Sequence, residues 1–446
     1  MKAKIVDQST GYSAKVAAVF LFNVLTGVGI LALPSSIAKA GIISGSICLT
    51  IVAFMAFVSA TFLIEVLSTA NAWVRFHPIH IGKGQTKACA FKEFGEKLVA
   101  KSKSLGLTNP FEIVESVELG QMTELFLGTV GSTLFYAVLC LYLFGDLAIY
   151  AVSVATTLTR VLGSQPEISY YSFLLGFIMV IGPFCFFNFQ KTKVLQLSTM
   201  VLRNTAMVLM IVLVINDIAS GKRVPINQVV LFDMEETKEL LGTAVFSFMC
   251  HHTISSLIML IRDKHKALAV FLFDYTIELL YCSVLVGTAI LSRPPSEINA
   301  LYTLTFRDYP VEILAKFLSF YPVFTLSSNF PLICITLRNN LLTLFNVKSV
   351  PYSQPIFTLV ALIPPMTLAA AVHDVSKLVV LTGSFAGLAI MLLTPAFLVL
   401  YSRRKLRRLI GPNWHEMHPH LSPFQHNAWI YLVLAFAAFV FLIRVF

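Results

Sequence analysis

The first apolar segment of the chain is interrupted at its centre, where residues 22–29 read FNVLTGVG. Each glycine inside a helix costs about 1 kcal/mol relative to alanine, and the polar side chains of Asn23 and Thr26 offer the backbone other hydrogen-bond partners. Residues 247–256, SFMCHHTISS, interrupt a later apolar segment in the same way. Non-helical backbone at membrane depth persists only where protein or a water-filled cavity surrounds it. The two segments therefore predict two broken membrane helices.

The composition calls for a membrane around these helices. Of the 446 residues, 57% are hydrophobic and 13% are charged, whereas a soluble protein averages about 25% charged residues. The chain lacks the polar residues needed to cover several soluble domains. Its formal net charge of +10 accompanies no clustered basic face with interleaved aromatics, so no nucleic-acid partner is expected. The lipid bilayer is the expected surrounding.

Eleven stretches reach the roughly 20 apolar residues that cross a bilayer. They are residues 13–40, 42–73, 129–158, 170–189, 194–217, 239–261, 267–292, 311–336, 355–373, 377–402 and 427–446. The interruptions fall in the first and the sixth, which are matching positions in two five-helix repeats. Transporters built from inverted repeats break their helices at such positions and bind substrate there. We predict an all-α polytopic membrane protein of 11 transmembrane helices: a 5+5 inverted repeat (LeuT-like) with helices 1 and 6 broken, plus one C-terminal helix.

The division of the chain follows from these spans. The predicted parts are a cytoplasmic N-terminus (1–12), a first repeat (13–217), a second repeat (239–402), and a basic cytoplasmic loop with helix 11 (403–446). About two-thirds of the 33 Lys and Arg residues then fall on the side of the N-terminus, which the positive-inside rule places in the cytoplasm. Eleven crossings put the C-terminus on the extracellular or lumenal side. The plasma membrane and an endolysosomal membrane both remain open.

A cytoplasmic loop, residues 74–128, separates the second and third spans. Residues 74–110 are polar, rich in Lys and Gly and without helical periodicity, which predicts a flexible segment. From Phe111 to Leu127, apolar residues recur roughly along one face with glutamates between them, which predicts an amphipathic helix. The glutamates disfavour binding to anionic lipid, so this helix is expected to pack on the bundle.

Several motifs resemble a known family. Residues 22–34 resemble the first-helix signature of the amino acid/auxin permease family, a branch of the amino acid–polyamine–organocation transporters. Residues 142–150 (YLFGDLAIY) and 246–251 (FSFMCH) resemble its third and sixth spans. Residues 111–113, 118–122, 145–150, 329–331 (NFP) and 336–340 (TLRNN) are similar to the transmembrane protein 104 family within it. The resemblance runs from about residue 11 to residue 446 and implies an eleven-span, inverted-repeat fold that transports amino acids.

The resemblance implies a substrate site at the two breaks, with residues 23–29 at the carboxylate of an amino acid. Backbone N–H groups at the start of a half-helix suit an anion. Carbonyls near residues 246–249 would accept from the substrate ammonium, with Phe246 or Phe248 as a gate. The predicted substrate-binding residues are Asn23, Thr26, Gly27, Val28, Gly29, Phe246, Ser247, Phe248, Cys250 and His251. Neither broken segment contains a carboxylate, so a neutral amino acid is the expected substrate.

Either Na⁺ or H⁺ is the expected coupling ion. Members of the family hold sodium with carbonyls of the first span and a Ser or Thr of the eighth, which implies Thr325, Ser327 and Ser328 here. Histidine titrates near physiological pH, so a histidine pair at mid-depth is the alternative, with an aspartate of the third span. The predicted ion-coupling residues are Thr325, Ser327, Ser328, His251, His252 and Asp146. No metal and no other cofactor is expected.

Each of these features has a structural alternative. A Gly-x-Gly pair in a membrane helix often lets two helices pack closely, and Ser or Thr often bonds to the preceding helical turn. A buried histidine is often functional, but structural hydrogen bonds also hold such residues. Buried charges usually pair, and Arg203 or Lys316 are the expected partners for acids within the spans. These acids are Glu65, Asp146, Asp274 and Glu278.

Two functions fit this sequence. The first is a secondary transporter of amino acids, and the second is a non-transporting amino-acid sensor or scaffold of the same fold. Both need the same site, so the sequence does not separate them. An enzyme is disfavoured, because the chain contains neither His-Glu-x-x-His nor Gly-x-Ser-x-Gly. The protein partners are unknown.

Overall fold

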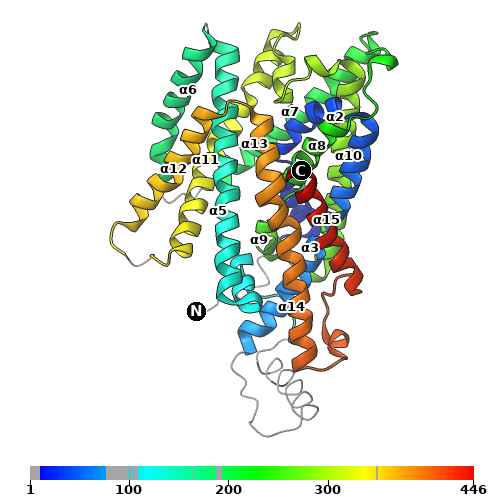
Figure 1. The fold of residues 1–446 in the computed structure, drawn as a ribbon, viewed down its shortest axis with the longest axis vertical. Coiled ribbons are helices and arrows are strands. Elements are labelled where there is room, and N and C mark those ends of the chain that lie inside the picture. The colour runs from blue at the N-terminus through cyan, green and yellow to red at the C-terminus, as the bar shows by residue number, and fades with distance from the viewer. Residues whose placement is uncertain are drawn as a thin grey trace.

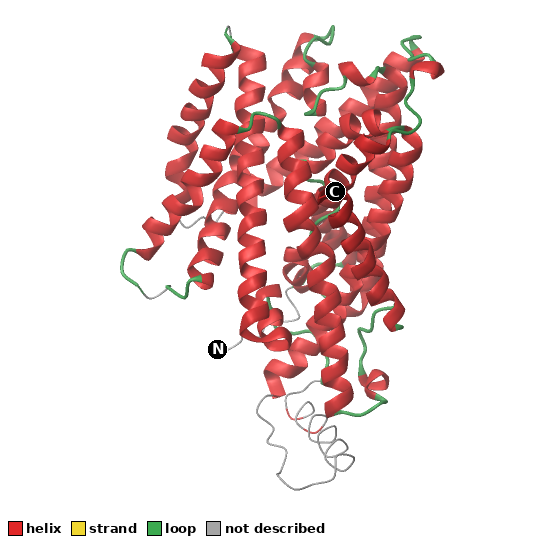
Figure 2. Ribbon diagram, in the orientation of Figure 1, coloured by secondary structure: helices red, strands yellow, loops and turns green. Residues whose placement is uncertain are grey.

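Long helices make up most of the structure, a computed structural model that describes residues 11–76, 100, 104, 109–163, 165–186, 193–347 and 350–445 (Figures 1 and 2). The helices are α1 (Ala14–Leu25), α2 (Gly29–Ala40), α3 (Ile42–Phe76), α5 (Leu119–Leu162), α6 (Pro166–Ile181), α7 (Lys193–Ala219), α8 (Met234–Ser247), α9 (Ile254–Leu260), α10 (Ala267–Ser292), α11 (Glu312–Leu344), α12 (Ser353–Ala371), α13 (Val375–Thr382), α14 (Thr394–Leu409) and α15 (Asn427–Val445). Between α13 and α14 lie two π-helical segments, Gly383–Gly387 and Ala389–Leu393.

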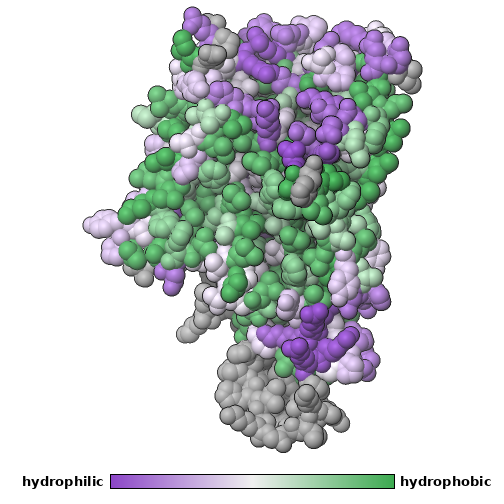
Figure 3. Space-filling view, viewed as in Figure 1, coloured by the Kyte–Doolittle hydropathy of each residue, from purple (hydrophilic) through white to green (hydrophobic). Residues whose placement is uncertain are grey.

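An apolar belt surrounds the bundle. Ten helices in the described residues are long and apolar enough to cross a membrane, and α1 with α2 forms an eleventh if the bent pair is one span. Large side chains such as Val130 and Ile313 lie exposed on the outside. Figure 3 shows the apolar surface as a band with hydrophilic surface above and below it. A soluble protein does not expose so much contiguous apolar area. The predicted all-α polytopic membrane fold is confirmed.

Both predicted breaks are present. α1 ends at Leu25, α2 begins at Gly29, and the two helices meet at an angle of 56°. α8 ends at Ser247 and α9 begins at Ile254, with one turn of 3₁₀-helix at His251–Thr253 between them. In Figure 1 the chain rises through α2 at the upper end and descends from α8 to α9, so the two broken spans run in opposite directions. α2 packs along α8, which brings the breaks together.

The helix predicted over residues 111–127 forms only in its second part. The side chain of Asn71 on α3 accepts from the backbone N–H groups of Val114 (3.0 Å) and Glu115 (2.8 Å) and donates to the Glu115 carbonyl (3.0 Å). These bonds use the backbone groups that a helix needs, so residues 111–118 stay extended or irregular against α3. The helix starts at Leu119, where Glu118 and Gln121 form a capping box. The prediction that this segment packs on the bundle is confirmed, because Phe111 is buried.

The other boundaries differ in two places. The basic run at residues 403–408, expected to open a loop, instead continues α14 to Leu409, and its first residue, Arg403, is buried. The flexible segment predicted for residues 74–110 lies mostly outside the described residues, although α3 continues through residues 74–76. Lys316, expected as an intramembrane partner for a buried acid, is exposed and pairs with Glu312 one turn earlier on α11.

Candidate substrate and ion site

The first break leaves the start of α2 open. The Thr26 N–H and hydroxyl both donate to the Phe22 carbonyl, at 2.9 and 2.7 Å, and the Gly27 N–H donates to the Leu25 carbonyl at 2.7 Å. These bonds end α1 and turn the chain. The first N–H groups of a helix have no partners within it, so the amides of Val28 and Gly29 are available to a ligand. The dipole of α2 favours an anion at this position.

The two glycines of the break have different roles. A Cβ atom on Gly29 would lie 2.7 Å from Ser247 Oγ and 2.9 Å from Ser247 Cα, so only glycine lets α2 approach α8 this closely. Close packing therefore explains Gly29. A Cβ atom on Gly27 would meet only the Leu25 carbonyl, at 3.8 Å. Gly27 therefore borders open space at the break.

The predicted residues of the second break separate into core and site. Phe248 is fully buried and closes the end of α8 with a hydrogen bond from its N–H to the Ala244 carbonyl (3.1 Å). Cys250 is also fully buried, with its Sγ 3.3 Å from the hydroxyl of Tyr275 on α10. Phe246 lies beside Gly29, and its ring centroid is 6.0 Å from that of Tyr142 on α5. Of the two predicted gating aromatics, Phe246 is the one placed between α2 and α5.

The two histidines are also placed differently. His251 Nε2 lies 2.9 Å from Ser59 Oγ and 3.1 Å from the Ala56 carbonyl, so this histidine holds the start of α9 to α3. The ring of His252 packs 5.6 Å from that of Tyr142. Nδ1 of both histidines is buried without a hydrogen-bond partner among the described residues, but His251 as a whole is buried, whereas His252 is half-buried. His252 is therefore the more accessible of the two histidines. Asp146 is buried on α5, one turn after Tyr142.

Arg203 of α7 binds two carbonyls of the first span, the span whose carbonyls were expected to bind sodium. Its Nη1 donates to the Asn23 carbonyl at 2.8 Å and also to the Thr26 carbonyl. The hydroxyls of the eighth span bond within their own helix instead: Thr325 Oγ1 to the Tyr321 carbonyl (2.8 Å) and Ser328 Oγ to the Thr325 carbonyl (2.9 Å). Thr325 and Ser328 therefore bond to the preceding helical turn, which is the structural alternative to sodium binding. The side chain of Ser327 is half-buried.

A buried carboxylate also reaches the first break. Thr26 Oγ1 lies 3.3 Å from Glu278 Oε2 of α10, and Glu278 is completely buried. Thr26 lies between Glu278 and Arg203, because its hydroxyl is 3.3 Å from Glu278 and its carbonyl accepts from Arg203; no ion pair joins Arg203 and Glu278 within the described structure. Asp274, one turn before Glu278, has a buried oxygen, Oδ2, without a partner in the described part of the chain. The sequence identifies Arg203 and Glu278 as charged residues within spans five and seven but does not assign them to the site. Their depth in the membrane is the feature of the sequence that points to a functional role.

At the end of the bundle that carries the N-terminus, a closing loop (residues 410–426, between α14 and α15) covers the helices. Arg403 pairs with Glu65 through two bonds of 2.7 and 2.8 Å and also donates to the Gln425 carbonyl at 2.7 Å. The N–H of Ser422 donates to Glu65 at 3.0 Å. His418 Nε2 lies 3.2 Å from the hydroxyl of Thr69 on α3. The loop is therefore fixed to α3 and α14.

Docking of the closing loop is expected to depend on pH. Burial lowers the pKa of His418 from 6.5 to about 3 and that of His420 to about 4; nearby positive charge, from Arg403 for His418 and from His265 for His420, acts in the same direction. The docked loop therefore holds both rings neutral, whereas a released loop takes up protons below about pH 6.5. Docking is at full strength above pH 6.5 and weakens as the pH falls toward 4.

Tryptophan emission tests this dependence, because Trp414 of the closing loop is buried. Lowering the pH from 7.5 to 5 is expected to shift its emission to the red in the wild type. A His418→Gln/His420→Gln variant is expected to lack this shift, and a Trp414→Phe variant identifies the signal. An equal shift in the histidine double variant would assign the dependence to other groups.

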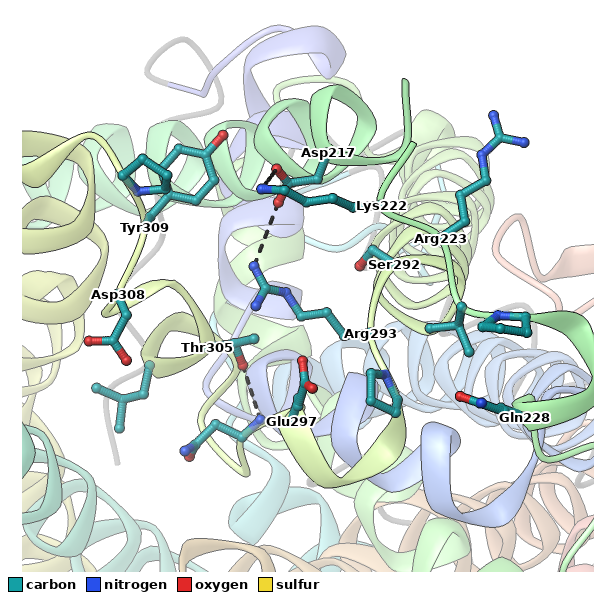
Figure 4. A pocket seen from close by; sticks show the side chains of 16 residues that line it. Asp217, Lys222, Arg223, Gln228, Ser292, Arg293, Glu297, Thr305, Asp308 and Tyr309 are labelled. Atoms are coloured by element: carbon teal, nitrogen blue, oxygen red, sulfur yellow. Dashed lines mark hydrogen bonds and ion pairs between the residues drawn. The ribbon is translucent and has the colours of Figure 1, made fainter. Parts of the chain in front are cut away.

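At the opposite end, a pocket of about 740 Å³ lies between the ends of α7 and α10 and the segment at residues 304–310. Figure 4 shows Lys222 and Arg293 directed toward Asp217. Their distances to the carboxylate are 3.1 Å and 3.6 Å. Arg223, Glu297 and Asp308 also line the pocket. Both signs of charge therefore occur in this pocket.

The fold and the site together define a class of protein: a multi-pass membrane transporter with two discontinuous helices packed against each other. The family model for "Transmembrane amino acid transporter protein" matches residues 10–444. The chain belongs to this family, in the branch that contains transmembrane protein 104, which confirms the resemblance seen in its motifs. Membership also fits the expectation of a non-enzymatic role.

The relatives match the chain from end to end. A transmembrane protein 104 homolog from Dictyostelium discoideum is 36% identical over 98% of this chain and 97% of its own length. Transmembrane protein 104 of Homo sapiens is 34% identical, with 99% and 98% covered. The homolog from Caenorhabditis elegans is 28% identical, with 97% and 96% covered.

Among solved structures, a manganese transporter of Eremococcus coleocola, in complex with an aromatic bis-isothiourea substituted compound, aligns with 97% of this chain and 92% of its own. The sequence identity is 12% and the TM-score is 0.48. A likeness this distant bears on neither the substrate nor the mechanism.

Proposed function

We propose that the chain is a secondary transporter of neutral amino acids that moves its substrate with protons, by alternating access around the α1–α2 and α8–α9 breaks. The observation that carries this proposal is the contact of the two breaks at Gly29 and Ser247. One break presents N–H groups at the start of α2, and the other presents carbonyl groups at the end of α8. These are the complements of the carboxylate and the ammonium of an amino acid.

The charge balance of the site supports a neutral substrate. Glu278 adds a carboxylate that neither broken segment contains, but Arg203 lies nearby and offsets it. An amino acid with no net charge adds none to this balance. Backbone groups recognise the part that all amino acids share, so selectivity is left to the side chains around the breaks. Phe246, Tyr142 and His252 form an aromatic wall beside the second break and suit an apolar substrate side chain.

Glu278 is the proposed proton carrier, in place of the histidine pair. Sodium is disfavoured because Arg203 already binds the Asn23 and Thr26 carbonyls. A proton on Glu278 would cancel its negative charge and leave the positive charge of Arg203 uncompensated near the start of α2. The site would then hold a substrate carboxylate more strongly. Loss of the proton would weaken this hold, which links proton movement to substrate movement.

The orientation is part of the proposal. Lys15, Arg262, Lys264 and Lys266 lie at the end of the bundle that carries the N-terminus, together with the basic run at residues 403–408. By the positive-inside rule this end faces the cytoplasm. The C-terminus then lies on the extracellular or lumenal side.

Uptake of labelled amino acids into proteoliposomes, with sodium and pH gradients varied separately, tests the function. We expect saturable uptake that follows an inward proton gradient and is independent of sodium. Glu278→Gln is expected to abolish gradient-driven accumulation while exchange of labelled for unlabelled substrate continues. Glu312→Gln, at an exposed carboxylate on α11, is the matched control and is expected to behave as the wild type.

Three outcomes would contradict the proposal. Sodium-driven accumulation by the wild type would exclude the proton. Proton-driven accumulation by Glu278→Gln would exclude Glu278 as the carrier. Saturable binding without flux would indicate a non-transporting amino-acid sensor or scaffold.

A further inference from the structure

A groove of about 750 Å³ opens on the membrane-facing side of the bundle, between α1, α7 and α10. Its walls are mainly apolar and include Phe22 of α1 and Phe273 of α10. α1 and α7 each pack against α10, and Asn204 is the residue of α7 that lines the groove. The groove is separate from the polar pocket at the opposite end, and its deep end reaches Phe22, where the first break begins.

The groove has the length of a lipid tail. On α10 it extends from Lys266 to Ile277, which is about 16 Å at a rise of 1.5 Å per residue. Half of a typical hydrocarbon core is about 15 Å. The groove therefore runs from the edge of the membrane to about its middle. Asp274 lies near the deep end but is 1% exposed, so an occupant meets the apolar side chains around it.

Two lysines stand at the shallow end. Lys15 is the second residue of α1, and Lys266 immediately precedes α10; both are exposed and line the groove. The start of α1 is held at this level by hydrogen bonds from the Tyr12 N–H to the Leu260 carbonyl (2.7 Å) and from the Arg262 N–H to the Tyr12 carbonyl (2.9 Å). Asp263, 3.6 Å from Lys266, is also exposed and only partly offsets this positive charge.

We propose that this groove binds an anionic glycerophospholipid, with one acyl chain between α1 and α10 and the phosphate on Lys15 and Lys266. A basic mouth above an apolar interhelical groove is the arrangement that acidic headgroups and their chains require. The bilayer supplies this ligand continuously. The occupied groove joins the first half of the broken span to α10, so the lipid stabilises the conformation in which these helices are together. The binding itself does not depend on the proposed transport.

Lipid retention measured by native mass spectrometry, after exchange into phosphatidylserine or phosphatidylcholine, tests the proposal. The wild type is expected to retain phosphatidylserine and to lose phosphatidylcholine. Lys15→Ala/Lys266→Ala is expected to weaken phosphatidylserine binding about 30-fold, from roughly a fivefold loss per lysine. Ala269→Trp, which fills the groove without a change of charge, is expected to abolish retention.

The matched control is Lys39→Ala/Lys377→Ala, which removes two exposed lysines at the opposite end. It is expected to retain phosphatidylserine as the wild type does. Equal retention by the Lys15/Lys266 and Lys39/Lys377 variants would overturn the headgroup assignment. Retention by Ala269→Trp, or equal retention of phosphatidylcholine by the wild type, would overturn the groove as the site.

Discussion

Arg403→Ala is expected to lower the free energy of unfolding by about 3–5 kcal/mol, the cost of removing one partner from a buried ion pair. Glu65 is fully buried, and its carboxylate accepts its two shortest bonds, at 2.7 and 2.8 Å, from this guanidinium. The variant would leave a buried charge with the Ser422 N–H as its remaining strong donor within the described structure. It would also free the Gln425 carbonyl, so the closing loop would lose its main anchor.

Thermal unfolding in one detergent measures this effect. Lys316→Ala removes an ion pair with Glu312 on the exposed face of α11 and is the control, with an expected change below about 1 kcal/mol. Glu65→Leu/Arg403→Met is expected to recover most of the lost stability, since replacing both charges leaves no uncompensated ion. An unfolding midpoint for Arg403→Ala equal to that of the control would show that water or another cation reaches Glu65.

This ion pair shows that hydropathy alone does not identify the partner of a buried charge. The positive charge of the run at residues 403–408 was recognised in the sequence, and it was used only to orient the chain. Its first residue instead pairs with an acid 338 positions earlier, because α14 packs along α3. Periodicity and composition report which stretches enter the membrane. They do not report which faces meet, so partners of buried charges stay unassigned until the helices are packed.

The broken segments were more predictable than their surroundings. In residues 22–29 the pattern that predicts the break and the break itself coincide. Polar and glycine residues at mid-depth weaken the helix at the place where it bends. The residues that complete the site come from other spans: Arg203 lies 177 positions from Thr26, and Glu278 lies 252 positions from it. A local pattern cannot reveal such neighbours. In the same way, Asn71 of α3 overrides the helical periodicity of residues 111–118 through bonds that only the fold creates.

Arg203→Ala is expected to reduce uptake at least 100-fold, which corresponds to about 2.7 kcal/mol in the barrier. The guanidinium binds the Asn23 and Thr26 carbonyls on either side of the point where α1 ends. Without it, two partly buried carbonyls lose their donor, at up to about 1–3 kcal/mol each, and the carboxylate of Glu278 loses a nearby positive charge. The broken segment would no longer be held in one geometry. Proteoliposome uptake and the unfolding midpoint, measured on the same preparation, separate lost function from lost fold.

Arg203→Lys distinguishes the charge from the shape of the side chain. Both bonds come from one nitrogen, Nη1, so an ammonium group near that position can donate to both carbonyls without the planar fork of arginine. Lysine is therefore expected to restore much of the uptake that alanine removes. Arg223→Ala, at an exposed arginine of the opposite pocket, is the control and should leave uptake within about twofold, since a surface change of this kind costs less than about 0.5 kcal/mol. Uptake by Arg203→Ala equal to that of this control would show that the carbonyls of the first break have another donor. The argument that Arg203 excludes sodium from these carbonyls would then be wrong.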